Sequence, residues 1–154
     1  AYTGNIDINE NMRYYYTAAD GKWYCGLVDV DLGMFSFQCF ETVTEAFHHN
    51  AIPEALMANK EFRAMVAKRL AELLKGSLSD EAMIANIDWM AGIIRNEVAM
   101  DCARWGGTSK HWERMVGDLK TFCDGRAERL INSFCSSFHL SDAEKQEYFG
   151  DLLK

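Results

Sequence analysis

The chain has 154 residues, 49% of them apolar, and a formal net charge of −7 at pH 7. This length suits one domain with a buried core, and the apolar fraction argues against a disordered chain. The negative charge argues against a nucleic-acid-binding surface, which needs a basic stripe, but it fits a protein that meets anionic phosphates through a bound cation. No run of about eighteen apolar residues occurs, so we expect no membrane span.

The first predicted element is a β-hairpin over residues 12–31. Residues 12–17 are rich in aromatic side chains, which favour a strand, and Asp20-Gly21 supplies the turn. Residues 22–30 return as the second strand, in which Leu27 and Val28 indicate burial. Because an isolated hairpin is barely stable, we expect this one to pack on the helices that follow.

From about residue 41 onward the pattern is helical. Pro53 suits a first helical turn, and the apolar spacing over residues 62–74 predicts a helix that ends at Gly76. Ser79 is the expected N-cap of one long helix that residues 104–107 terminate. Its expected inward stripe is Met83, Ile87, Met90, Ile94 and Val98.

Three shorter helices complete the prediction. Thr108 or Ser109 caps the first, whose inward residues are expected to be Trp112, Met115, Val116, Leu119 and Phe122. Gly125 separates it from a helix that buries Leu130, Ile131 and Phe134, and residues 141–144 form a capping box for the last. We interpret Trp89, Trp105, Trp112, Met83, Met90 and Met100 as packing residues, and the charged run Arg126, Glu128 and Arg129 as a solvated face.

The predicted fold class is therefore α+β and mostly α-helical, with a short N-terminal hairpin packed on a helical body. We expect one domain over residues 1–154, divided into a hairpin and loop region at 1–40 and a helical body at 41–154. The five cysteines occur singly and form no C-x-x-C pair, which argues against a zinc site and leaves one disulfide open. The adjacent His48 and His49 would point about 100° apart on a helix, so we do not expect them to share an ion.

Acidic residues gather around the hairpin. Asp29 and Asp31 are two residues apart at the end of the predicted second strand, where a period of two would put both carboxylates on one face. Two unpaired carboxylates this close repel each other, and a bound cation would relieve that repulsion. Their hard oxygen ligands suit magnesium or manganese. Asp7 and Asn11 lie in the loop before the hairpin.

The order of these residues is that of a protein-kinase catalytic region. Kinases carry a catalytic Asp, then an Asn, two short strands and a metal-binding Asp followed by a loop. Asp7, Asn11 and Asp29 follow this order, and Asp31-Leu32-Gly33 is similar to the kinase D-F-G. Two departures are that Asn11 follows Asp7 by four residues rather than five, and that no His-Arg precedes Asp7.

Short segments at both ends of the chain resemble the spore-coat protein H (CotH) kinase family, whose patterns include G-N-x-D, N-I-[RK]-F-Y, G-K-W and D-L-D-x-G-F. The matching segments here are residues 4–7 (GNID), 11–15 (NMRYY), 20–23 (DGKW), 29–33 (DVDLG), 59–63 (NKEFR), 69–74 (RLAELL), 104–106 (RWG) and 112–113 (WE). The resemblance covers residues 4–135, and only the ordered set is specific.

The resemblance implies the C-lobe-like part of an atypical kinase fold that phosphorylates Ser or Thr hydroxyls with ATP and Mg²⁺ or Mn²⁺. It implies Asp7 as the catalytic Asp, Asn11 as a metal ligand, Asp29 as the principal metal ligand and Asp31 as a second candidate ligand. Implied partners are protein substrates or spore-coat and surface proteins, which favours a spore-coat or cell-surface location over the cytoplasm.

The sequence contains neither a phosphate-covering loop nor a convincing phosphate-binding lysine ahead of Asp7. We therefore expect a fragment that lacks the N-terminal lobe and does not transfer phosphate alone. Two other functions stay open. One is a metal-dependent glycosyltransferase, which would need a preceding nucleotide-binding domain; the other is a non-catalytic pseudokinase or scaffold module of a surface or spore-coat assembly.

Overall fold

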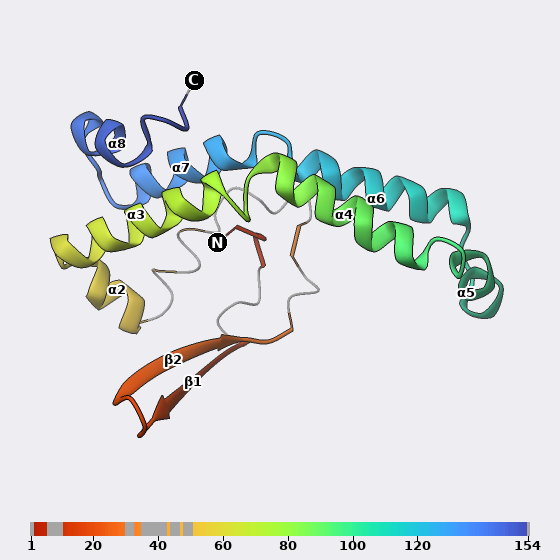
Figure 1. Ribbon diagram of the computed structural model, residues 1–154, viewed down its shortest axis with the longest axis horizontal. Coiled ribbons are helices and arrows are strands. Elements are labelled where there is room, and N and C mark those ends of the chain that lie inside the picture. Colours follow the sequence, from red (N-terminus) through yellow and green to blue (C-terminus); the bar gives the residue numbers. More distant parts are fainter. Residues whose placement is uncertain are drawn as a thin grey trace.

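The computed structural model describes residues 2–5, 11–29, 33–34, 43, 47 and 51–153. Within these ranges a two-stranded antiparallel sheet precedes seven helices, labelled α2 to α8 (Figure 1). The predicted α+β, mostly helical fold class is confirmed.

The hairpin consists of β1, Met12–Thr17, and β2, Lys22–Leu27, with Tyr15 opposite Tyr24. Its turn is the predicted one, since Gly21 adopts φ 67°, which glycine reaches without strain. Asp20 fixes the turn by accepting hydrogen bonds from the Lys22 N–H at 3.1 Å and from the Tyr24 hydroxyl.

The second strand is shorter than predicted and ends at Leu27. Val28 still bonds to the other side of the hairpin, since its N–H donates to the Asn11 carbonyl at 2.9 Å. The next residue, Asp29, has φ 58°, a left-handed conformation that no strand continues through. The expected burial of Val28 is wrong, because its residue surface is 49% exposed where the chain turns away.

The aromatic side chains of the hairpin pack mainly on each other. The Tyr15 and Tyr24 rings stack with centroids 5.4 Å apart, and those of Tyr16 and Trp23 lie 5.5 Å apart. Trp23 remains 72% exposed, and the hairpin projects away from the helices in Figure 1. In the described part of the chain, the hairpin and α2 share a pocket of about 400 Å³, to which Ile52 contributes from the helical side.

Helices α2, Ala51–Met57, and α3, Lys60–Lys75, form a helical corner, and Pro53 lies in the first turn of α2 as predicted. Asn59 caps α3 by accepting the Phe62 N–H at 3.0 Å. The Arg63 guanidinium reaches back to the Met57 carbonyl at 2.8 Å and so satisfies the end of α2. Gly76 follows α3 as the predicted stop.

The prediction of one long helix after Ser79 is wrong, although Ser79 is the N-cap and accepts the Ala82 N–H at 3.2 Å. The chain forms α4, Asp80–Ile94, and then α5, Val98–Trp105. The break occurs where the Glu97 N–H bonds to the Ile94 carbonyl three residues back, which tightens the turn and redirects the axis.

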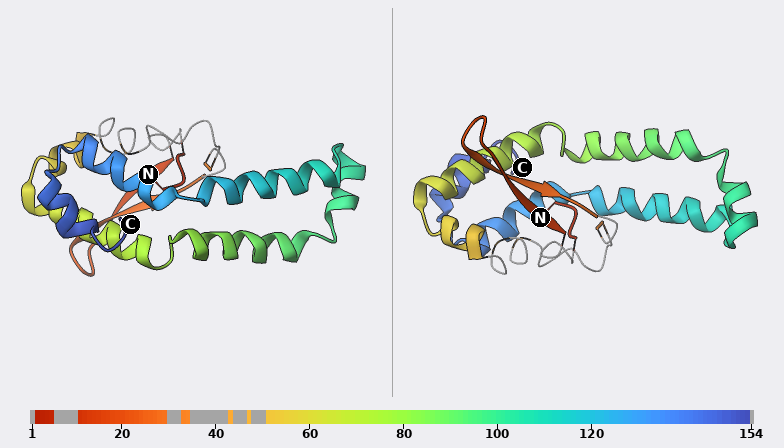
Figure 2. Two further views of the ribbon diagram at one scale, coloured as in Figure 1. Left: turned by 90° about the horizontal axis from the view of Figure 1, so that it is seen from above. Right: turned by 90° about the horizontal axis from the view of Figure 1, so that it is seen from below.

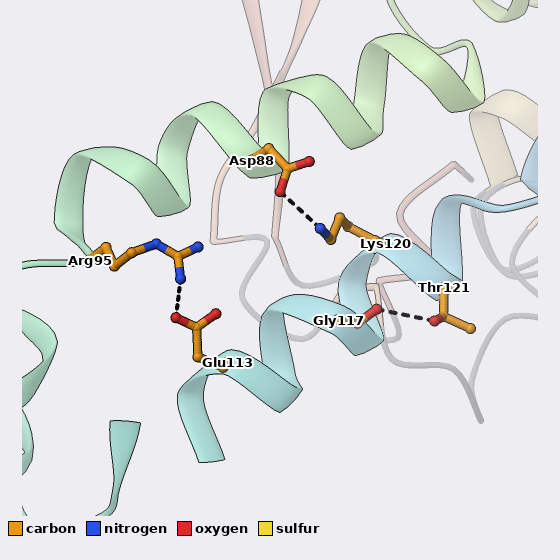
Figure 3. Close-up of polar contacts among 6 residues, drawn as sticks. All are labelled: Asp88, Arg95, Glu113, Gly117, Lys120 and Thr121. Carbon is orange, nitrogen blue, oxygen red and sulfur yellow. Dashed lines mark hydrogen bonds and ion pairs between the residues drawn. The ribbon is translucent and has the colours of Figure 1, made fainter. Parts of the chain in front are cut away.

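Helices α4 and α6, Ser109–Cys123, lie side by side and project from the body as an arm, with α5 across its end (Figures 1 and 2). Thr108 is the N-cap of α6, as one of the two predicted residues. Two ion pairs link the helices, Asp88 with Lys120 at 2.9 Å and Arg95 with Glu113 (Figure 3).

The prediction that the tryptophan and methionine side chains of the arm are packing residues is wrong for four of them. Trp89 and Trp105 are 67% and 73% exposed, and Met90 and Met100 are 61% and 68% exposed. An arm of two adjacent helices has only one buried seam, so a helix that is apolar on more than one side leaves large side chains in solvent.

The core lies around α7, Arg126–Ser137, at the other end of the molecule, where α8, Asp142–Phe149, and α3 pack nearby (Figure 2). The predicted burial of Leu130, Ile131 and Phe134 is confirmed. The side chains less than 2% exposed are Arg126, Phe122, Phe134, Phe149, Leu74, Leu130, Ile131, Val43 and Cys123. None of the helices in the described ranges meets the length and hydropathy of a bilayer span.

The predicted capping box of α8 is confirmed, and it makes the stability of this helix pH-dependent. The Glu144 carboxylate accepts hydrogen bonds from the Ser141 N–H at 2.9 Å and from the Ser141 hydroxyl at 2.7 Å. These two hydrogen bonds hold the pKa of the Glu144 carboxyl below its ordinary value. A lowered folded-state pKa contributes stability above the unfolded pKa, near 4.3, and that contribution is lost as pH falls through the folded value.

We therefore expect Glu144→Gln to destabilise the protein at neutral pH, with the difference from wild type shrinking as the medium becomes acidic. Chemical denaturation at several pH values measures this difference. Glu61→Gln, an exposed carboxylate in the first turn of α3, is the control for general charge effects. A pH-independent loss in Glu144→Gln would contradict the assignment.

Candidate functional site

Three segments distant in the sequence meet at the base of the hairpin. The Met34 N–H donates to the Thr3 carbonyl, and the Val28 N–H donates to the Asn11 carbonyl at 2.9 Å. The N-terminal segment, the start of β1 and the chain beyond β2 are thus joined by backbone hydrogen bonds. This junction contains two of the four residues that the sequence nominates for phosphate chemistry, Asn11 and Asp29.

Two asparagine side chains converge on one backbone carbonyl at this junction. The Asn5 and Asn11 Nδ2 atoms donate to the Asp29 carbonyl at 3.1 and 3.0 Å. Asn5 is only 3% exposed, so its amide is a buried group whose hydrogen bond matters for stability. The pair clamps Asp29 in its left-handed conformation, which Asp and Asn tolerate better than other non-glycine residues.

The same hydrogen bonds orient the oxygen atoms of the site. The oxygen and nitrogen of a carboxamide lie in one plane on the same carbon, so donation from Asn11 Nδ2 restricts where Asn11 Oδ1 can point. The Asp29 side chain is exposed, while its backbone is held by the two asparagines. Carboxylate and amide oxygens are hard ligands of the kind that Mg²⁺ and Mn²⁺ prefer.

The structure brings Asn11 and Asp29 together, whereas Asp7 and Asp31 lie outside the described residues. The strand-period argument for Asp29 and Asp31 is wrong in its premise, because Asp29 follows the strand in a left-handed conformation. Within the described ranges, no three His, Cys, Asp or Glu residues form a group that could hold a metal ion. Asn11 and Asp29 could at most supply part of a ligand set.

Arg126 is the residue that the sequence analysis most misjudged. It was predicted to be solvated but is 1% exposed, and its Nε donates to the Tyr2 carbonyl at 2.9 Å. Its guanidinium also lies 4.8 Å from the Phe122 ring centroid and 5.9 Å from that of Tyr2. Arg126 thus fastens the N-terminal segment, which leads to Asn5, onto the first turn of α7.

Asp80 in turn fixes the start of α7. Its carboxylate accepts from the Gly125 N–H at 2.7 Å and from the Ala127 N–H at 3.3 Å. These are amides of a helix N-terminus, where negative charge is favourable. Hydrogen bonds therefore link the first turn of α4 to the first turn of α7, and the first turn of α7 to the N-terminal segment that leads to the junction.

Sequence reasoning could have found Asn5 but not Arg126. Asn5 belongs to the GNID segment that carried the resemblance, although only Asp7 was assigned a role. Arg126 stands in a run of charged residues at a helix start, and nothing local distinguishes it from its solvated neighbours. Its burial is set by Tyr2 and Phe122, which are remote in sequence or on another helix.

Beside Arg126, the Tyr2 hydroxyl and the Cys123 thiol lie buried together. Burial, with the neighbouring Cys123, raises the pKa of Tyr2 far above its ordinary value. Burial likewise raises the pKa of the Cys123 thiol. Both groups are therefore neutral at physiological pH, and the Cys123 thiol lacks the thiolate character of a catalytic nucleophile.

Other segments that carried the resemblance have structural roles. Asn59 and Arg63 join α2 to α3, as described above. Gly106, with φ 88°, ends α5 after Trp105. The Arg95 guanidinium lies 5.3 Å from the Trp112 ring centroid while it pairs with Glu113.

The histidines and cysteines lie apart from the hairpin junction or outside the described residues. The His111 Nδ1 atom lies 2.9 Å from the Arg114 guanidinium, and His111 belongs to no group of three His, Cys, Asp or Glu residues that could hold a metal ion in the described ranges. His48 and His49 lie outside the described residues. The described cysteines, Cys25, Cys102, Cys123 and Cys135, carry free thiols.

The comparisons with known proteins agree with the resemblance of the short segments. The family model described as CotH kinase protein matches residues 1–130, which is most of the 154-residue chain. No curated protein matches the sequence significantly. No solved structure matches it either. The extent of the family match shows that this chain belongs to the CotH kinase family.

Proposed function

We propose that the chain forms the metal- and catalysis-bearing part of an atypical protein kinase, which transfers the γ-phosphate of ATP to Ser or Thr hydroxyls of a protein substrate. Membership of the CotH kinase family supports the reaction class. The observation that carries the site is the clamp of Asn5 and Asn11 on the Asp29 carbonyl. It joins the segment before the hairpin to the residue after it, as a kinase-like metal site requires.

In this proposal Asp7 orients the attacking hydroxyl and accepts its proton. Asn11 and Asp29 hold a divalent cation, and Asp31 is a further candidate ligand. Asn5 and Arg126 are positioning residues, since they hold backbone carbonyls rather than substrate. Their rigid hydrogen bonds would limit the motion of the ligands, which matters because small misplacements slow phosphoryl transfer.

The donor chemistry of the described residues fits Mg²⁺ or Mn²⁺. An amide oxygen from Asn11 and a carboxylate from Asp29 are both hard oxygen ligands. When bound, the cation would neutralise phosphate charge in the transition state. The protein contributes a fixed backbone at Asp29, so only the side-chain torsions of Asp29 have to be ordered when the metal binds.

The test is Mg²⁺ and Mn²⁺ titration, with and without ATP, followed by thermal unfolding of wild type and Asp29→Asn. Asparagine tolerates φ 58° and can leave the clamped carbonyl in place, so this substitution removes the carboxylate charge without changing the backbone conformation. At a cation concentration of about 100 times its Kd, binding stabilises the wild type by about 2.7 kcal/mol. We expect Asp29→Asn to lose most of that stabilisation.

Asp118→Asn is the matched control, because Asp118 is an exposed carboxylate on α6, away from the hairpin. It should retain the full metal-dependent shift. Equal shifts in wild type and both variants would reject the metal site. Phosphate incorporation into Ser- and Thr-containing peptides by the full-length parent protein, measured by mass spectrometry, tests the transfer reaction itself, and the chain alone is expected to be inactive in the same assay.

The alternative is a non-catalytic pseudokinase or scaffold module of a spore-coat or cell-surface assembly. The exposed aromatic and aliphatic side chains of the hairpin and the arm favour it, since large exposed apolar surfaces commonly serve interactions. The same titration separates the two functions. A scaffold would show no stabilisation by Mg²⁺ or Mn²⁺ in the presence or absence of ATP.

A further inference from the structure

We propose that a pocket at the end of the arm binds a linear aliphatic polyamine, whose ammonium groups pair with Glu97 and Asp101. The pocket has a volume of about 510 Å³ and lies where α5 crosses between the end of α4 and the start of α6 (Figures 1 and 2). We call it the arm-tip pocket. It is built from other elements than the hairpin junction, so the inference is independent of the phosphotransfer chemistry proposed there.

Apolar side chains from all three helices of the arm line the arm-tip pocket. They are Ile94 of α4, Val98 and Cys102 of α5, and Trp112 and Met115 of α6. Val98 is 8% exposed, and Trp112 and Met115 are partly buried, so these side chains belong to the packing of the arm. A mostly apolar pocket of a few hundred Å³ with a small number of polar groups is typical of a small-molecule site.

Two carboxylates, those of Glu97 and Asp101, also line the arm-tip pocket. The Asp101 N–H donates to the Glu97 carbonyl at 3.0 Å, and residues four apart in this way are neighbours on one side of a helix. In the part of the chain that the structure describes, neither carboxylate forms an ion pair, and Glu97 makes no capping hydrogen bond although it is the N-cap of α5. A cationic ligand would relieve the repulsion between them.

The basic side chains of the same region are held elsewhere. Arg95 pairs with Glu113, and the Arg104 guanidinium lies 4.8 Å from the Trp105 ring centroid. The residues that line the arm-tip pocket include no lysine and no arginine. With His111 neutral, the lining therefore carries two negative charges and no positive one, which favours a cation as the ligand.

An organic cation fits this lining better than a metal ion. Cys102 and His111 also line the pocket, yet no three His, Cys, Asp or Glu residues in the described ranges form a group that could hold a metal. An ammonium group needs only a carboxylate, and methylene groups gain free energy from contact with an apolar wall. Residues four apart on a helix have Cβ atoms about 5–6 Å apart, which a short diamine unit spans. A linear polyamine combines these features.

Isothermal titration calorimetry of the whole chain with spermidine tests the proposal. We expect one saturable site, whose dissociation constant rises by at least about tenfold in Glu97→Gln and in Asp101→Asn, the effect of losing one charge-assisted hydrogen bond. Both side chains are exposed, and the Glu97 carboxylate does not cap α5, so both variants should fold; circular dichroism verifies this.

Glu147→Gln is the matched control, because Glu147 is exposed on α8 and the change removes the same charge. It should bind spermidine as wild type does. A wild type without a saturable site overturns the proposal. Equal weakening in all three variants also overturns it, since spermidine would then respond only to the net charge of −7. The same holds if a lysine-containing peptide occupies the pocket and spermidine does not, since a protein would then be the ligand.

Discussion

Arg126→Met should lower the free energy of unfolding by about 2–4 kcal/mol, because it removes a buried, hydrogen-bonded charge and leaves its partner unsatisfied. Methionine keeps most of the apolar stem that packs on Phe122 and Tyr2 but cannot donate to the Tyr2 carbonyl. The loss should therefore reflect the missing polar bonds rather than a cavity. Urea denaturation followed by circular dichroism measures it.

Arg69→Met is the control for the same chemical change at the surface. Arg69 pairs with Glu72 at 2.9 Å, but both side chains are about two-thirds exposed, so this ion pair contributes little. We expect a change within about 0.5 kcal/mol. Equal losses in the two variants would mean that Arg126 does not anchor the N-terminal segment.

The Arg126 variant also connects the helical body to the site. The guanidinium holds Tyr2, three residues before Asn5, which clamps Asp29. If this chain of hydrogen bonds positions the metal ligands, Arg126→Met should weaken Mg²⁺-dependent stabilisation even at a temperature where the variant is folded. Such an effect distinguishes positioning of the site from a purely global loss of stability.

Phe134→Ala should destabilise the protein still more, by about 3–5 kcal/mol, since it opens a cavity in the most buried part of the core. The Phe134 ring is 1% exposed, and its centroid lies 5.0 Å from that of Phe138 and 6.0 Å from that of Phe149. Removing it takes contacts from α7 and from α8 together. A shortened or lost native baseline in thermal unfolding would accompany the shift.

Phe134→Leu refills most of the volume and should recover much of this loss. Trp105→Ala, measured at low protein concentration, truncates a 73% exposed aromatic and should change stability by no more than about 0.5 kcal/mol. If Phe134→Ala were as mild as Trp105→Ala, the core would not centre on α7.

The order of residues around the hairpin was enough to identify the family, and local patterns were enough to place most helix ends. The predicted caps at Ser79, Thr108 and Ser141 act within a single turn, so their hydrogen bonds depend on neighbours in sequence. The cap at Asn59 is equally local but was not predicted. The β1 bounds and the turn at Gly21 were predicted for the same reason. The division of the long helix into α4 and α5 was not predicted, because the break at residues 95–97 contains no proline or glycine and Gly92 lies within α4.

The sequence by itself determined the fold class, the hairpin, the capped helices and membership of the CotH kinase family, since each depends on residue types at short or fixed spacing. Only the tertiary structure decided that Asn5 and Asn11 meet at the Asp29 carbonyl, that Arg126 is buried and that Trp89 is not. Helical periodicity reveals an apolar side chain but not whether another element covers it. Contacts between residues 18 to 124 positions apart depend on how the elements pack in space.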